Sequence, residues 1–102
     1  MSVLLTVTYR VSEDLETFRA RAMEVAAQIA DAPGLRWKVW GLGSDGSGVS
    51  AYLFETANAA NAFANGPIIA GLKANPAVQG VTLVSAPVDA TLSQVTHAGF
   101  AT

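Results

Sequence analysis

The side chains best suited to chemistry lie in two short segments, residues 35–42 and 49–55. A buried lysine with a lowered pKa can act as a base or orient an oxyanion, and a tyrosine hydroxyl can donate to a carbonyl or quinone oxygen. Tryptophan and phenylalanine rings can stack on a flat aromatic molecule. We therefore expect catalytic roles for Lys38 and Tyr52. The expected substrate-binding residues are the three other aromatic side chains of these segments, Trp37, Trp40 and Phe54.

Each of these side chains also has a purely structural interpretation. Lys38 could reach solvent past a neighbouring ring, and Tyr52 could belong to an interface with its hydroxyl satisfied. Phe54 could serve only in packing. Because Trp37 and Trp40 are an odd number of residues apart, they point to opposite faces of one strand. We expect Trp37 on the face that helices cover and Trp40 on the other face, so that at most one of them lines a given cavity.

The chain offers little for binding a metal or a cofactor. His97 is the only histidine, and its place near the chain end favours a surface position. With no cysteine, one histidine cannot form an ordinary zinc site, although a mixed carboxylate site stays open. One histidine would suffice as an axial haem ligand, but no neighbouring pattern favours this. The glycine pairs at 41 and 43 and at 46 and 48 lie between two strands, which excludes a dinucleotide-binding loop. We expect no cofactor.

The pattern around these residues predicts the element order β-α-β-β-α-β, the ferredoxin-like arrangement of an α+β fold with a four-stranded antiparallel sheet. Alternation and β-branched residues indicate strands, and a three-to-four spacing of apolar residues after Ser12, the expected N-cap, indicates the first helix. Thr56 and Pro67 are suited to begin the next two helices. Without a linker or an internal repeat, residues 1–102 are expected to form one domain. The expected strands are 3–9, 35–42, 49–55 and 79–88, and the expected helices run from about 15 to 29 and over 57–64, with short ones after Pro67 and within 91–98.

Two helices can cover only one face of such a sheet, so the other face should be polar or covered by a partner. From regular alternation we place two apolar sets beneath the helices: Leu35, Trp37, Val39; and Val49, Ala51, Leu53. The helix-free face would then carry Arg36, Lys38, Trp40, Ser50, Tyr52 and Phe54, together with Leu4, Thr6 and Thr8. Three large aromatic rings there, in a chain that is 51% hydrophobic and 14% charged, favour a two-fold homodimer. A monomer with a partly aromatic surface, or with this face covered by its C-terminal tail, is the alternative.

Charge and hydropathy exclude several classes of partner. The formal net charge is −2 and the basic residues form no stripe, which argues against nucleic-acid binding. No apolar run approaches the length needed to cross a bilayer, and the first residues do not form a signal peptide. We therefore expect a cytoplasmic protein whose partners are a second copy of itself and a small apolar or aromatic ligand.

Three segments resemble the YdhR-like family of monooxygenases. Residues 33–40, Pro-Gly-Leu-Arg-Trp-Lys-Val-Trp, are similar to the family's P-G-[apolar]-x-W-K-x-W stretch, and Tyr52-Leu53-Phe54 is similar to its following Y-L-F strand. Residues 92–95 resemble its leucine-serine-glutamine segment near the C-terminus. The resemblance covers nearly the whole chain. It implies a dimeric α+β barrel of two ferredoxin-like units with facing sheets, and an oxygenase function.

Relatives with this barrel include cofactor-independent quinone-forming monooxygenases, haem-degrading enzymes, isomerases and binding modules, so the fold alone does not fix the function. Two hypotheses follow. The first is a cofactor-independent monooxygenase that acts on a small aromatic or polyphenolic compound in a dry, aromatic-lined pocket, with the substrate supplying the electrons. The second is a non-catalytic dimeric module that binds a small ligand or a protein partner. Oxygen consumption separates the two, and a Soret band on titration would reveal haem binding.

Overall fold

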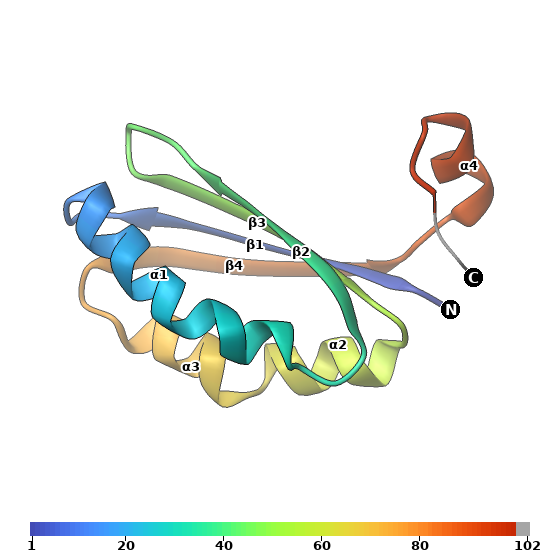
Figure 1. The fold of residues 1–102 in the computed structure, drawn as a ribbon, viewed down its shortest axis with the longest axis horizontal. Coiled ribbons are helices and arrows are strands. Elements are labelled where there is room, and N and C mark those ends of the chain that lie inside the picture. Colours follow the sequence, from blue (N-terminus) through green and yellow to red (C-terminus); the bar gives the residue numbers. More distant parts are fainter. Residues whose placement is uncertain (100–102) are drawn as a thin grey trace.

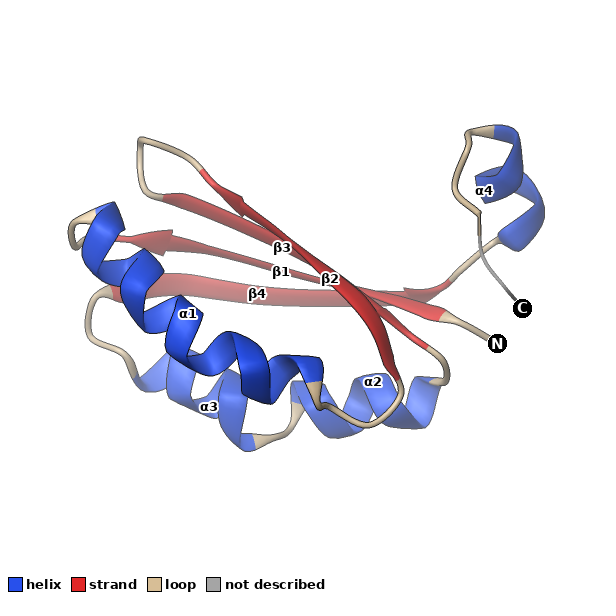
Figure 2. Ribbon diagram, viewed as in Figure 1, coloured by secondary structure: helices blue, strands red, loops and turns tan. Residues whose placement is uncertain are grey.

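The computed structural model describes residues 1–99 and shows the ferredoxin-like arrangement predicted from the sequence. The four strands form one antiparallel sheet in the order β2-β3-β1-β4, and α1, α2 and α3 cover one of its faces (Figures 1 and 2). A short last helix, α4, lies beyond one end of the sheet, away from the helical layer (Figure 1). The elements are β1 (Val3–Val11), α1 (Leu15–Ala30), β2 (Leu35–Leu42), β3 (Ser47–Phe54), α2 (Ala57–Ala64), α3 (Pro67–Ala74), β4 (Val78–Pro87) and α4 (Ala90–Val95).

Side-chain caps fix where α1, α2 and α4 begin. Thr56 caps α2 by accepting a hydrogen bond from the Ala59 N–H at 3.1 Å, as predicted. The prediction of Ser12 as the cap of α1 is wrong, because Asp14 accepts the hydrogen bond from the Thr17 N–H at 3.2 Å. Ser12 is instead held to the start of β4: both its backbone N–H (2.8 Å) and its hydroxyl (3.2 Å) donate to the carbonyl of Ala77.

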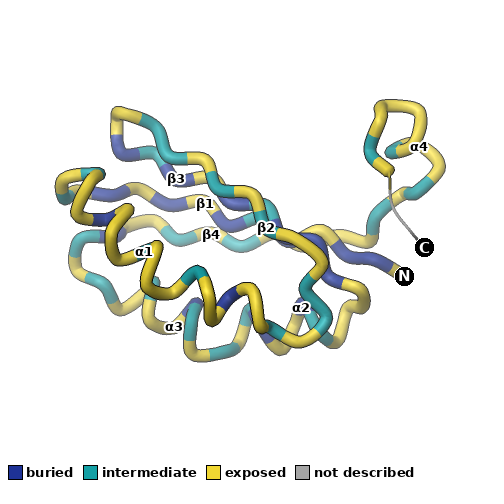
Figure 3. The backbone as a smooth tube through the Cα atoms, in the orientation of Figure 1, coloured by how far each residue is buried: buried dark blue, intermediate teal, exposed yellow. Residues whose placement is uncertain are grey.

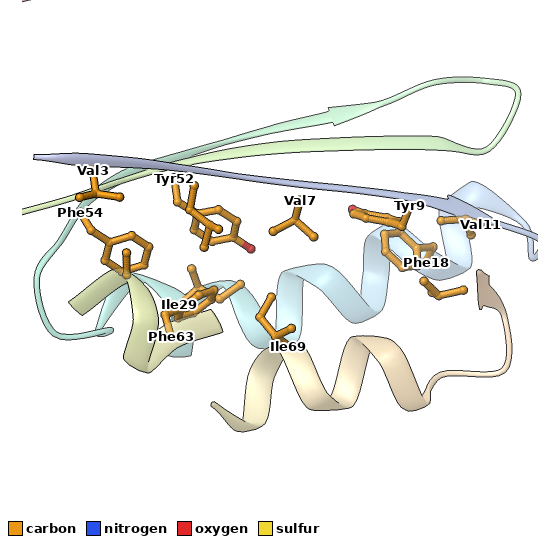
Figure 4. Packing of buried hydrophobic residues seen from close by; sticks show 13 residues of the cluster. Val3, Val7, Tyr9, Val11, Phe18, Ile29, Tyr52, Phe54, Phe63 and Ile69 are labelled. Atoms are coloured by element: carbon orange, nitrogen blue, oxygen red, sulfur yellow. The ribbon is translucent and has the colours of Figure 1, made fainter. Parts of the chain in front are cut away.

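The hydrophobic core lies between the sheet and the three covering helices (Figure 4). Strand β1 contributes every second residue to it, as predicted, with Val3, Leu5, Val7 and Tyr9 all buried. Aromatic side chains form much of the rest. The ring of Phe63 in α2 lies 4.9 Å from the ring of Tyr52 and 5.5 Å from that of Phe54, centroid to centroid. Such tilted pairs stabilise a core beyond the area they bury.

Strand β3 faces the opposite way from the prediction. Directly opposite residues on antiparallel neighbours share a face of the sheet. Val3, Leu5 and Val7 of β1 pair with Phe54, Tyr52 and Ser50 of β3. Because the β1 residues lie beneath the helices, Ser50, Tyr52 and Phe54 lie there too, and the set expected in their place points away from the helices.

A one-residue bulge reverses the expected orientation of β2 as well. Leu35 pairs with Phe54, whereas Trp37 pairs with the next residue of β3, Leu53. Arg36 is therefore an extra residue, and an extra residue inverts the alternation of side chains beyond it. Leu35 packs on the core as expected, but Lys38 and Trp40 follow it beneath the helices.

Trp37 and Val39, predicted to lie beneath the helices, are exposed on the helix-free face. Figure 3 shows exposed stretches, in yellow, along β2. This face is nevertheless apolar, because aliphatic residues take the place of the expected aromatic ones. Leu53 is buried on it, between Trp37 and Leu4. The exposed large residues there are Leu4 (36% exposed), Trp37 (40%), Val39 (60%), Val49 (53%) and Val84 (60%). The argument for a covering partner therefore depends on different residues from those expected, and the homodimer stays a prediction.

Strand β4 and the segment that follows it agree with the predictions from the sequence. Pro87 ends β4, which is an edge of the sheet, so its missing N–H leaves no neighbouring strand without a donor. Asp89 caps α4, and His97 follows this helix at an exposed position with a left-handed backbone, φ 74°. Among residues 1–99, no helix is both long and apolar enough to cross a membrane.

Candidate functional site

A pocket of about 280 Å³ lies between the sheet and the helices α1 and α3. Its size is close to the lower end of the range for small-molecule sites, which are usually apolar with a few placed polar groups. The helical wall is mostly apolar and includes Val25, Ile29 and Leu72. The sheet wall carries the polar and aromatic groups: Tyr9 from β1, Lys38 and Trp40 from β2, and Ser50 and Tyr52 from β3.

Strand pairing explains why these side chains meet. Lys38 is paired with Tyr52, and Trp40 is paired with Ser50. The two pairs are two residues apart on both strands, so all four side chains stand on one face as close neighbours. The bulge at Arg36 is therefore what brings the predicted catalytic residues Lys38 and Tyr52 into one pocket, together with the ring of Trp40.

The ammonium group of Lys38 lies against aromatic rings. Its Nζ is 3.1 Å from the centroid of the Trp40 ring and 4.6 Å from that of Tyr52. In the described part of the chain, the ion pairs are Arg21 with Glu13 and Arg36 with Glu55, so neither supplies a carboxylate to Lys38. Burial lowers the pKa of Lys38 to about 7. The contact with the Trp40 ring favours the cation and opposes this shift.

The two tyrosines stay neutral over a wide pH range. Burial raises the pKa of Tyr52, and the nearby Tyr9 raises it further. Burial also raises the pKa of Tyr9, and the neighbouring Ser50 hydroxyl partly offsets this. Their hydroxyl groups point toward one another along β1, on either side of Val7 (Figure 4). Both can therefore donate hydrogen bonds into the same region.

Ser50 adds an unsatisfied polar group to that region. It is opposite Val7 in β1, between the positions of the two tyrosines, and it is only 2% exposed. Although its hydroxyl is close enough to influence Tyr9, its oxygen has no partner with hydrogen-bond geometry in the protein. A buried polar atom without a partner costs on the order of 1–3 kcal/mol, so the pocket favours a ligand that carries an oxygen atom at this point.

The structure does not bring the other predicted site residues into this pocket. Trp37 is on the opposite face and does not line this pocket, although it lines a second hollow at the edge of β2 together with Lys38 and Trp40. Phe54 is fully buried and packs on Tyr52 and Phe63, which is the structural interpretation considered above. His97 lies after α4 and does not line the pocket.

The sequence pattern indicated no role for Tyr9 or Arg21, which also line the pocket, and it placed Ser50 on the helix-free face. The spacing of Ser50 two residues before Tyr52 was the available signal, because residues two apart in a strand share a face. Tyr9 continues the buried alternation of β1 and carried a similar signal. No sequence signal indicated Arg21, because its place in the pocket depends on how α1 lies over the sheet.

The described residues show no group of three or more His, Cys, Asp or Glu side chains that could hold a metal ion. Since the sole histidine is outside the pocket, haem ligated by an imidazole of this chain does not fit there. The protein is thus an α+β protein with a ferredoxin-like fold and an aromatic pocket between sheet and helices.

A family model described as "Putative mono-oxygenase ydhR" matches residues 4–99. The chain therefore belongs to this monooxygenase family, as the sequence resemblance indicated. A search of curated proteins finds no match.

Solved structures confirm the fold. A point mutant of the cofactor-independent oxygenase SnoaB from Streptomyces nogalater is 18% identical with a TM-score of 0.69, over 86% of this chain and 93% of that one. The haem degrader MhuD from Mycobacterium tuberculosis, with two haems in its active site, is 22% identical with a TM-score of 0.65, over 85% and 95%. Rv0793 from the same organism is 15% identical with a TM-score of 0.67, over 87% and 97%.

Proposed function

We propose that the protein is a monooxygenase that oxidises a small aromatic or polyphenolic compound in the pocket beneath α1, without a metal or flavin. The observation that carries the proposal is the convergence of Lys38, Tyr52 and Ser50 beside the Trp40 ring, in a pocket with otherwise mostly apolar walls. Such a site can hold a flat ring by stacking and orient its oxygen atoms by hydrogen bonds. Membership of the monooxygenase family supports the class of reaction.

The residues suggest how a phenolic substrate would be prepared for reaction with oxygen. The neutral amine of Lys38 accepts the phenol proton, and the ammonium formed stays beside the phenolate oxygen. Tyr52, held neutral by burial, donates its hydroxyl to an oxygen of the substrate. An electron-rich phenolate can then react with O₂ directly. In the overall reaction the substrate loses two hydrogens and gains one oxygen atom, and the second oxygen atom leaves as water, so the substrate supplies all the electrons.

The proposal includes a homodimer in which the helix-free faces of two copies pack together. The support is the apolar surface on that face, from Leu4, Trp37, Val39, Val49 and Val84. Contiguous apolar surface of this kind marks interaction sites, and a two-fold pair is the commonest way to cover it with an identical face. A cytoplasmic location stays a prediction.

Oxygen uptake with a panel of hydroxylated aromatic compounds tests the activity. With oxygen-18 gas, one labelled atom should enter the product and one should enter water. K38M and Y52F should lower the turnover number, whereas K73M, which changes the only other lysine at an exposed site on α3, should not. Thermal stabilisation by these compounds without any turnover would refute the enzyme and support the non-catalytic binding module.

A further inference from the structure

Lys38 is an amine without an ionic partner at the wall of an aromatic pocket. Its Nζ lies over the Trp40 ring at 3.1 Å, and no ion pair in the described chain reaches it. The hydroxyls of Tyr52 and Ser50 line the same pocket, and the Ser50 oxygen lacks a partner. An amine held in an apolar pocket is how proteins activate lysine as a nucleophile toward carbonyl compounds.

We propose that Lys38 forms a reversible imine with aromatic aldehydes that enter this pocket, a reactivity separate from the oxidation proposed above. The aldehyde ring would stack beside Trp40, which places its carbonyl carbon near Nζ. The hydroxyls of Tyr52 and Ser50 would hydrogen-bond to the carbonyl oxygen, which satisfies the buried Ser50 hydroxyl. The ligand class is therefore a planar aromatic ring that carries an aldehyde.

The condensation balances without a cofactor. The lone pair of Nζ attacks the carbonyl carbon and forms a C–N bond, and the carbonyl oxygen takes up a proton to give a carbinolamine. The C–O bond then breaks and the oxygen leaves as water, as the nitrogen gives up its second proton. One amine and one aldehyde thus yield one imine and one water, with no change in oxidation state.

The chain provides its own reference amines. It has two lysines, and Lys73 is exposed on α3. Burial lowers the pKa of Lys38 to about 7, so roughly half of it is neutral near neutral pH. An ordinary lysine is neutral in only about one molecule in 10³ at that pH. The amino-terminal amine, on the exposed residue Met1, is a second reference.

Reductive trapping tests the inference. The folded protein is treated at about pH 7 with 4-hydroxybenzaldehyde and cyanoborohydride, and the modified sites are located by peptide mapping and mass spectrometry. We expect Lys38 to be modified at least about tenfold faster than Lys73, because a much larger fraction of Lys38 is neutral. The expected ratio is smaller than the ratio of the neutral fractions, because the aldehyde must first enter the pocket to reach Lys38. Urea should abolish the preference, because both lysines are then ordinary. K38R should lose the fast site and keep the slow ones.

Equal rates at the two lysines of the folded protein, or a preference that persists in urea, would overturn the inference. 4-Hydroxybenzyl alcohol has the same ring without the carbonyl and should protect Lys38 by occupying the pocket. Stabilisation by the aldehyde without trapping at Lys38 would also overturn the imine, yet would leave the pocket and its proposed oxidation intact. Failure of the oxygen-uptake experiment, in turn, has no bearing on the trapping result.

Discussion

The lysine beneath α1 should make the protein more stable as the pH rises above neutral. Burial lowers the pKa of Lys38 from 10.5 to about 7, so the unfolded chain binds more protons at this site between those values. The free energy of unfolding therefore rises with pH across that window, by at most about 1.4 kcal/mol per pH unit. The destabilisation is fully present below the folded pKa and disappears above the unfolded one.

The size of the effect follows from two opposing contributions. The full difference in pKa would correspond to about 5 kcal/mol. Partial access of water to the side chain reduces this destabilisation. The Trp40 ring reduces it further, because it stabilises the cation by about 0.5–2 kcal/mol. We therefore expect K38M to be more stable than the wild type by about 2–3 kcal/mol at neutral pH, with the difference shrinking as the pH rises.

Urea unfolding at a fixed protein concentration, from about pH 6 to pH 9.5, measures this difference. The upper limit avoids the ionisation of tyrosine in the unfolded chain, which lowers the stability because the folded-state pKa values of Tyr9 and Tyr52 are raised. K73M is the matched control, since Lys73 is exposed, and its profile should run parallel to the wild type. Parallel profiles for the wild type and K38M would refute the argument that Lys38 is desolvated.

Three further substitutions test the packing of two glycine sites and the proposed dimer interface. G48V should destabilise by about 1–3 kcal/mol in urea unfolding, because the ring of Tyr9 occupies the space that a β-carbon needs; an unchanged midpoint would contradict that packing. G71A should stabilise α3 by about 0.5–1 kcal/mol, since nothing lies within 4 Å of the added carbon; destabilisation would mean that the site is not open. V39E should shift a dimer toward folded monomers in light scattering, whereas A27E on the exposed surface of α1 should not; a persistent dimer would show that the helix-free face is not the interface.

The element order, the antiparallel sheet and the family could be predicted because their signals are local. Apolar alternation in β1 had a single interpretation, and Thr56 and Pro67 mark helix starts by their own chemistry. The cap of α1 was predicted wrongly, because Ser12 and the actual cap, Asp14, are residue types that cap helices equally well. The structure uses Ser12 to hold β4, a contact with Ala77 sixty-five residues along the chain.

The faces of β2 and β3 could not be predicted, because both faces of this sheet are apolar. Alternation fixes the register only where one side is clearly polar. In β3 the set of Val49, Ala51 and Leu53 is as apolar as a core set, although it faces away from the helices. The bulge in β2 has no signature either, since its extra residue, Arg36, is not a glycine.

The same bulge determines what each face of the sheet can do. If β2 continued from Leu35 in regular alternation, without the bulge, Lys38 and Trp40 would project onto the helix-free face, where the lysine would be solvated and the pocket would lose its amine. With it, both join Tyr52 and Ser50 beneath α1, and Trp37 moves to the outer face. The polar groups are thus gathered inside while the outer face keeps mainly aliphatic residues and small threonines. The bulge therefore affects both the proposed site, by adding Lys38 and Trp40 to the pocket, and the proposed dimer interface, by placing Trp37 and Val39 on the outer face.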